Sequence, residues 1–94
     1  MASIESIARV LGITVEDVER RALRALIHEE LRRVRAEKVL ILARYGVREF
    51  SELWRKVEEG TVVDTIAHDD IVRLDYLEHR ERELEKILRE LEEK

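Results

Sequence analysis

Hydrophobic residues recur every three or four positions along most of this chain, which is the spacing of one face of an α-helix. Three such stretches end at a glycine, where a left-handed residue commonly closes a helix: Gly12, Gly46 and Gly60. The pattern predicts an all-α fold with one long central helix, a shorter N-terminal helix, a helical hairpin corner and an amphipathic C-terminal helix. We expect a single domain with a helical core and oligomerisation part over residues 1–60, a connector over 61–67 and a partner-binding helix over 68–94.

The long central helix is the best-defined element of the pattern. It is expected over residues 15–45, roughly 45 Å of helix, and the short helix before it over residues 4–11. Thr14 is a residue type that caps helix N-termini. Gly46 stands just beyond the helix, with Val47 placed to contact its last turn, as in a Schellman ending.

A third helix is expected over residues 49–59, because its apolar residues form one stripe at helical spacing: Phe50, Leu53, Trp54 and Val57. Tyr45, Phe50 and Trp54 are three of the four aromatic residues. We expect them to form a corner core where this helix folds back on the long one. Replacing Trp54 with alanine should then cost about 3–5 kcal/mol.

Residues 61–67 are the only stretch enriched in β-branched side chains. They are either a short strand or an extended connector, and the connector is favoured because one strand cannot pair its own backbone. The last helix is expected over residues 69–92, with leucines near heptad spacing. Glu81 interrupts that repeat, so the coiled-coil pattern is imperfect.

The long helix carries more apolar faces than a lone surface helix needs. We expect a second subunit to cover the surplus, so that the chain is a homo-oligomer. The alternative is a compact monomeric bundle with this helix at its centre. The residues assigned to oligomerisation are Ile27, Leu31, Val34, Val39, Leu40, Ile41 and Leu42.

Charge is distributed unevenly along the chain. Residues 1–48 carry a net charge of +3 and residues 49–94 a net charge of −7, which together give the overall −4. One face of the long helix forms an arginine stripe suited to phosphates: Arg21, Arg24, His28, Arg32 and Arg35. The stripe predicts either nucleic-acid binding or a solvated face with internal pairs such as Glu29 with Arg33.

Composition excludes several kinds of site. There is no cysteine, so a disulfide framework, a thiolate metal site and a cysteine nucleophile are all excluded. Asp75 and His79 have a spacing that suits a metal, but two ligands on one helix are ordinary surface neighbours. Arg21 and His28 have the Arg-to-His spacing found in the active sites of helical HEPN ribonucleases. A chain with this many arginines is expected to contain such a spacing by chance. We predict no enzyme activity, no metal and no cofactor.

The absence of asparagine and glutamine, with 43% charged residues, resembles proteins from hot environments. No apolar run approaches the roughly 18 residues that a membrane span needs. The N-terminal residues also lack the basic and apolar stretches of a secretory signal. We therefore expect a cytoplasmic protein with no membrane contact.

The sequence resembles small helical archaeal antitoxins of toxin–antitoxin operons in residues 11–19, in Tyr45-Gly46-Val47 and in residues 50–53. The resemblance implies a dimerising N-terminal half and an acidic C-terminal helix that masks a basic, toxin-like partner by occlusion. The leucines implied to anchor that partner are Leu77, Leu84, Leu88 and Leu91. The acidic residues implied to steer it are Glu78, Glu81 and Glu85.

Overall fold

The computed structural model describes residues 2–93 and confirms the all-α fold. It contains four helices, α1 (Ile4–Leu11), α2 (Val15–Ala43), α3 (Phe50–Glu58) and α4 (Asp64–Glu92), and no strand within the described range. None of these helices combines the length and the apolar content needed to cross a lipid bilayer.

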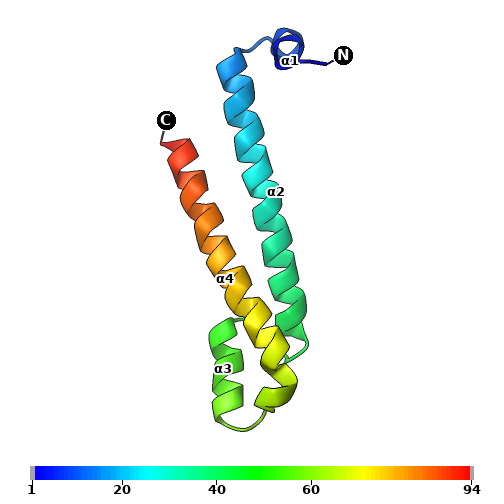
Figure 1. The fold of residues 1–94 in the computed structure, drawn as a ribbon, viewed down its shortest axis with the longest axis vertical. Coiled ribbons are helices and arrows are strands. Elements are labelled where there is room, and N and C mark those ends of the chain that lie inside the picture. Colours follow the sequence, from blue (N-terminus) through cyan, green and yellow to red (C-terminus); the bar gives the residue numbers. More distant parts are fainter. Residues whose placement is uncertain (1, 94) are drawn as a thin grey trace.

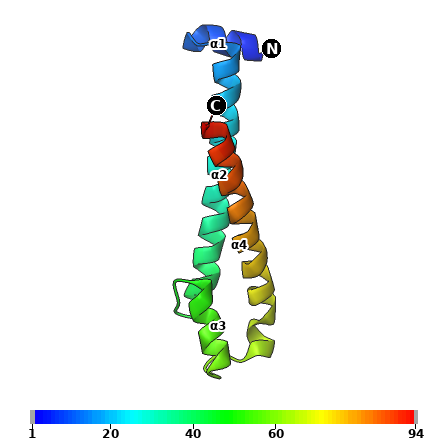
Figure 2. The ribbon, with the colours of Figure 1, turned by 90° about the vertical axis from the view of Figure 1, so that its left-hand side faces the viewer.

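The two long helices, α2 and α4, form an antiparallel hairpin, and α3 lies at its closed end (Figure 1). At the opposite end, α1 lies across the tip of α2 (Figure 2). The chain extends over 60 × 28 × 17 Å and has a radius of gyration of 19.1 Å. A compact chain of this length has a radius of gyration of about 12 Å, so this molecule is a rod with much exposed surface.

Local sequence determines both ends of α2. The Thr14 hydroxyl accepts a hydrogen bond from the N–H of Asp17 at 3.0 Å, as expected of a helix cap. At the other end, Gly46 has a φ of 66°, and the Val47 N–H donates to the Leu42 carbonyl at 3.2 Å. This is the Schellman ending predicted from the sequence, although the helix stops two residues earlier than expected.

The core lies along the seam between α2 and α4, and α3 closes its lower end. Its buried members are Leu31, Val34, Ile41, Leu42, Val47, Leu53, Ala67, Ile71, Leu74, Leu77 and Leu84. Four of the residues assigned to oligomerisation are therefore buried within their own chain. Ile27 is partly buried against the same cluster, and Val39 and Leu40 remain exposed.

The predicted connector over residues 61–67 is wrong in its second half, and the strand alternative is wrong as well. The helix α4 begins at Asp64 rather than at Asp69. Ala67, the fourth residue of α4, is completely buried, one helical turn before Ile71. The gain from packing this face against α2 outweighs the weak preference of β-branched residues for extended backbone.

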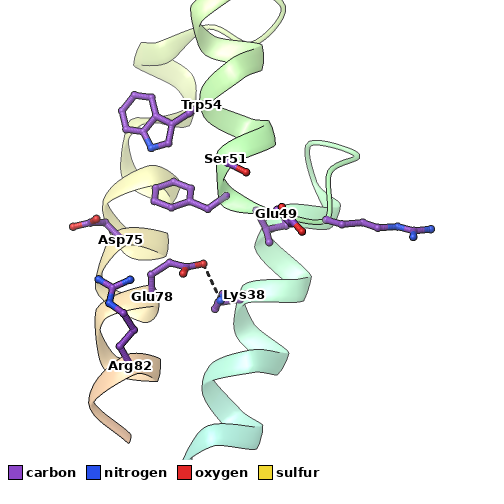
Figure 3. A pocket seen from close by; sticks show the side chains of 10 residues that line it. Lys38, Glu49, Ser51, Trp54, Asp75, Glu78 and Arg82 are labelled. Carbon is purple, nitrogen blue, oxygen red and sulfur yellow. Dashed lines mark ion pairs between the residues drawn. The ribbon is translucent and has the colours of Figure 1, made fainter. Parts of the chain in front are cut away.

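The predicted aromatic corner is only partly correct. Tyr45 and Phe50 pack against the core, but Trp54 is 44% exposed. Its ring lies 6.0 Å from the Phe50 ring, on the side of α3 that faces α4 (Figure 3). Leu53, with no exposed surface, is the residue by which α3 enters the core. The large loss of stability expected for Trp54→Ala therefore does not follow from this structure.

Candidate functional site

A ladder of ion pairs joins α2 to α4 along the whole hairpin. At the closed end, Asp70 of α4 accepts hydrogen bonds from Arg44 at 3.0 Å and from the Tyr45 hydroxyl at 2.5 Å. The Glu37 carboxylate accepts hydrogen bonds from two nitrogens of the Arg73 guanidinium, Nε and Nη2, at 2.5 and 2.7 Å. Most of these pairs join a base from the first half of the chain to an acid from the second. The uneven charge distribution is thus largely matched within one molecule.

The middle of this ladder is a polar layer inside the seam, formed by Arg35, Lys38, Glu78, Glu81 and Glu85. Lys38 Nζ lies 2.8 Å from Glu78 and 2.7 Å from Glu81 (Figure 3 shows the first of these pairs). Arg35 binds Glu81 at 2.8 Å and Glu85 at 3.0 Å. Glu81 interrupts the leucine repeat because its carboxylate has partners on α2.

The layer also shifts the pKa values of its members. Burial raises the pKa of Glu81, but hydrogen bonds from Lys38 and Arg35 outweigh that effect and leave the pKa below its usual value. Burial lowers the pKa of Lys38, and the hydrogen bonds to Glu78 and Glu81 likewise outweigh it, so the pKa is raised. Both groups are therefore charged at neutral pH, as the pairing requires.

The residues implied to bind a partner are mostly engaged within the chain. Leu77 and Leu84 are buried in the core, and Leu88 packs against it. Leu91 is half-buried near the end of α4. The three acidic residues implied to steer a partner, Glu78, Glu81 and Glu85, bind Lys38 and Arg35 instead. The inward face of α4 is thus unavailable to a partner while the hairpin is closed.

The arginine stripe is also partly neutralised. Arg32 binds the Glu29 carboxylate through two nitrogens at 2.7 and 3.0 Å, and Arg33 binds it at 3.1 Å. These hydrogen bonds lower the pKa of Glu29 to about 2. Arg35 is held by α4, as described above. The remaining stripe residues, Arg21, Arg24 and His28, form no ion pair within the part of the chain that the structure describes.

A cleft of about 500 Å³ opens between α2, the start of α3 and α4 (Figure 3). Its walls are Lys38, Leu42, Arg48, Glu49, Phe50, Ser51, Trp54, Asp75, Glu78 and Arg82. Three acidic and three basic side chains line it, together with two aromatic rings, so it has no excess of either charge. The opposite side of the hairpin has a smaller groove of about 170 Å³, partly lined by Tyr76.

Between these two hollows, α4 presents an outer face directed away from α2. We define the α4 outer face by its exposed residues Val72, Asp75, Tyr76, His79, Glu83, Lys86, Ile87 and Glu90. Of the ten acidic and five basic residues of α4, six acidic and three basic ones form no ion pair with α2. The unpaired part of α4 therefore carries a net charge of −3. The sequence signal for this face was the pair Val72 and Tyr76, one turn apart and opposite the leucines.

A second exposed apolar surface lies at the open end of the hairpin. We define the α1–α2 end by its exposed residues Ile7, Val10 and Leu11 of α1 and Leu23 and Leu26 of α2. Only Ala8 of α1 is buried, against α2. The expected oligomerisation residues did not include any of these five, although Ile7, Val10 and Leu11 lie on the apolar face of the first helix.

Among residues 2–93, no group of three potential metal ligands gathers at one place. His79 lies 3.3 Å from Glu83, one turn along the same exposed helix surface. No buried side-chain nitrogen or oxygen within this range lacks a hydrogen-bond partner. The candidate sites of the molecule are therefore its two exposed apolar surfaces, the α4 outer face and the α1–α2 end, together with their charges.

The fold and surfaces define a small all-α protein built on one helical hairpin. Over residues 1–94 the chain matches the model described as the uncharacterized protein MJ0235 family, so it belongs to that family. No curated protein and no solved structure matches it.

Proposed function

We propose that this protein is a non-enzymatic interaction module that acts in an antitoxin-like manner, by masking the basic surface of a partner protein with its C-terminal helix. The masking surface is the α4 outer face, rather than the leucines on its inward side. Binding requires no chemistry, only shape and charge complementarity.

The exposure of two large aromatic residues supports this proposal most directly. Trp54 is 44% exposed and lines the larger cleft beside the α4 outer face, and Tyr76, a member of that face, is 48% exposed and lines the smaller groove. Tryptophan and tyrosine are the residues that most often dominate binding energy at protein interfaces. Val72 and Ile87 add apolar area between and beyond them.

The charge of this surface determines the kind of partner that it fits. Three acidic side chains and one basic side chain lie on the α4 outer face beside the apolar residues: Asp75, Glu83, Glu90 and Lys86. The face is therefore acidic. A partner with a basic surface would approach such a face faster and dock in the correct orientation. Basic surfaces are typical of proteins that bind nucleic acid, including toxin nucleases, which is why masking is the proposed mode of action.

Co-expression with the product of the adjacent gene tests the proposal. We expect the two proteins to co-purify and Val72→Lys to reduce the retained partner at least about tenfold, because it places a cation where a basic surface must dock. Val39→Lys is the matched control, since Val39 is also more than half exposed but lies on α2. A neighbour that the wild-type chain neither binds nor neutralises would refute the proposal, as would equal loss in both variants.

Nucleic-acid binding is the second candidate, and the unpaired residues Arg21, Arg24 and His28 favour it. With two of the five stripe positions already bound to carboxylates, few phosphates would be contacted. Binding should then be weak and fall with salt. A gel-shift assay tests this: no complex at about 50 mM salt excludes the role, and loss of a complex in Arg21→Ala supports it.

A further inference from the structure

The open end of the hairpin is left uncovered by the chain itself. Ion pairs of Glu37 with Arg73 and of Glu30 with Arg80 set the antiparallel register of α2 and α4. In that register α4 ends before it reaches the N-terminal end of α2 (Figure 1). The first turns of α2 and the whole of α1 extend beyond the end of α4.

This end also exposes five large apolar side chains, more than the α4 outer face does. Val10 is 85% exposed, and Leu11, Leu23 and Leu26 are each more than half exposed. Apolar side chains gathered in this way mark an interaction site, because scattered single residues suffice to explain an ordinary surface. The reciprocal hydrogen bonds of Ser3 and Ser6, at 2.9 and 3.2 Å, keep α1 helical although few of its own residues are buried.

The chain exposes more surface than a compact monomer of the same mass, and the difference shows how much a partner could cover. The chain exposes 7116 Å², whereas a compact monomer of 11.2 kDa exposes about 5,700 Å². The excess of about 1,400 Å² is larger than the roughly 800 Å² that each partner contributes to a standard protein interface. One such interface would remove more than half of this excess, about 800 of about 1,400 Å².

Charge favours a second copy of the same chain as the occupant. Residues 1–26 contain four acidic and four basic side chains, so this end is neutral and the whole net charge of −4 lies in residues 27–94. Two copies meeting at their α1–α2 ends would bring neutral surfaces together and keep their acidic helices apart. Contact along the α4 helices would instead bring like charges together.

From these observations we infer that the protein forms a symmetric dimer through its α1–α2 end. In this dimer α1 of each chain covers Leu23 and Leu26 of the other. The interface is isologous, so each residue of the α1–α2 end is buried in both chains and occurs twice in the interface. It leaves the α4 outer face of both chains free, and it does not depend on the function proposed for that face.

Sedimentation equilibrium of the full chain tests the dimer. Leu26→Glu and Val10→Glu should each raise the dimer dissociation constant at least about 100-fold, since each removes two apolar contacts and buries two charges. Leu40→Glu is the matched control: Leu40 is exposed to a similar extent on α2 but lies outside the α1–α2 end. We expect its dissociation constant to stay within about threefold of the wild type.

All three positions are exposed in one chain, so the variants should fold, and circular dichroism checks that they do. Weakened dimers in Leu26→Glu and Val10→Glu, with an unaffected Leu40→Glu, support the inference. A wild-type chain that stays monomeric up to about 100 µM would overturn it, because the apolar end would then be left for a different protein. A dimer that Leu40→Glu weakens as much as Leu26→Glu would also overturn it.

Discussion

Replacing Lys38 with methionine removes the cation at the centre of the polar layer and keeps its volume nearly constant. Lys38 binds Glu78 and Glu81, and its side chain is 15% exposed. An exposed ion pair contributes about 0.2–1 kcal/mol, whereas removing one partner from a buried pair costs about 3–5 kcal/mol. With two partners and this degree of burial, we expect Lys38→Met to destabilise the protein by about 2 kcal/mol.

The double variant Lys38→Met with Glu81→Leu distinguishes a paired charge from a mere loss of packing. Leucine at position 81 would complete the heptad repeat between Leu77 and Leu84, and no unpaired lysine would remain opposite it. Replacing a buried ion pair by apolar residues is often neutral or stabilising. We therefore expect the double variant to lie within about 1 kcal/mol of the wild type, although each single variant is destabilised.

Urea unfolding followed by circular dichroism measures these differences, with all variants at one protein concentration because self-association adds to apparent stability. A loss below about 0.5 kcal/mol for Lys38→Met would refute the reasoning, since the layer would then behave as an exposed ion pair. Additive losses in the double variant would refute it as well, because they would show that Lys38 and Glu81 are not energetically coupled.

Three further predictions follow from the core, from one turn and from the titrating groups. Leu53→Ala should cost about 3 kcal/mol and Trp54→Ala about 1 kcal/mol in the same unfolding assay, because Leu53 is fully buried and Trp54 is not. Gly46→Ala should cost about 1 kcal/mol, because a side chain disfavours the φ of 66° at this position. A steric clash adds nothing, since an added Cβ would meet no atom within 4 Å. An unchanged urea midpoint of unfolding would contradict this prediction. Acid should destabilise the hairpin: the pKa values of Glu37 and Glu81 are lowered in the folded state, so their contribution is complete above pH 4.5 and is lost as the pH falls through the folded pKa values. An acid titration of Glu81→Leu should therefore show a shallower loss of stability than the wild type.

Both ends of α2 could be predicted from the sequence, because they depend on residues that are close together in the chain. Thr14 and Gly46 act within one turn of the chain, and the structure places both as predicted. The start of α4 could not be predicted from neighbouring residues. Thr65 and Ile66 favour extended backbone locally, but the burial of Ala67 against α2 decides the conformation.

The acidic residues of α4 that were expected to steer a partner bind α2 instead, and this too depends on contacts distant in the sequence. The partners of Glu81 are 43 and 46 residues away, at Lys38 and Arg35, and only the register between α2 and α4 brings them together. Without that register, acidic residues on α4 look free to steer a foreign protein. A signal was nevertheless present, because a glutamate at a core heptad position requires a cation on the facing helix.

The prediction of oligomerisation remains, but the structure moves its surface. The run from Val39 to Leu42 looked apolar on all sides, and the structure buries Ile41 and Leu42 within the same chain. The α1–α2 end was not identified because the exposure of a short apolar helix depends on where it packs. Here α1 lies across a tip that α4 does not reach (Figure 2).

Small-angle X-ray scattering tests most directly whether the apolar end of this rod is covered by a second copy. A single chain has a radius of gyration of 19.1 Å. Two chains overlapping only at their α1–α2 ends should give about 25–30 Å with the mass of two chains. A value near 19 Å with the mass of one chain would contradict the dimer, and a value of about 20 Å with the mass of two would show that the hairpins pair side by side instead.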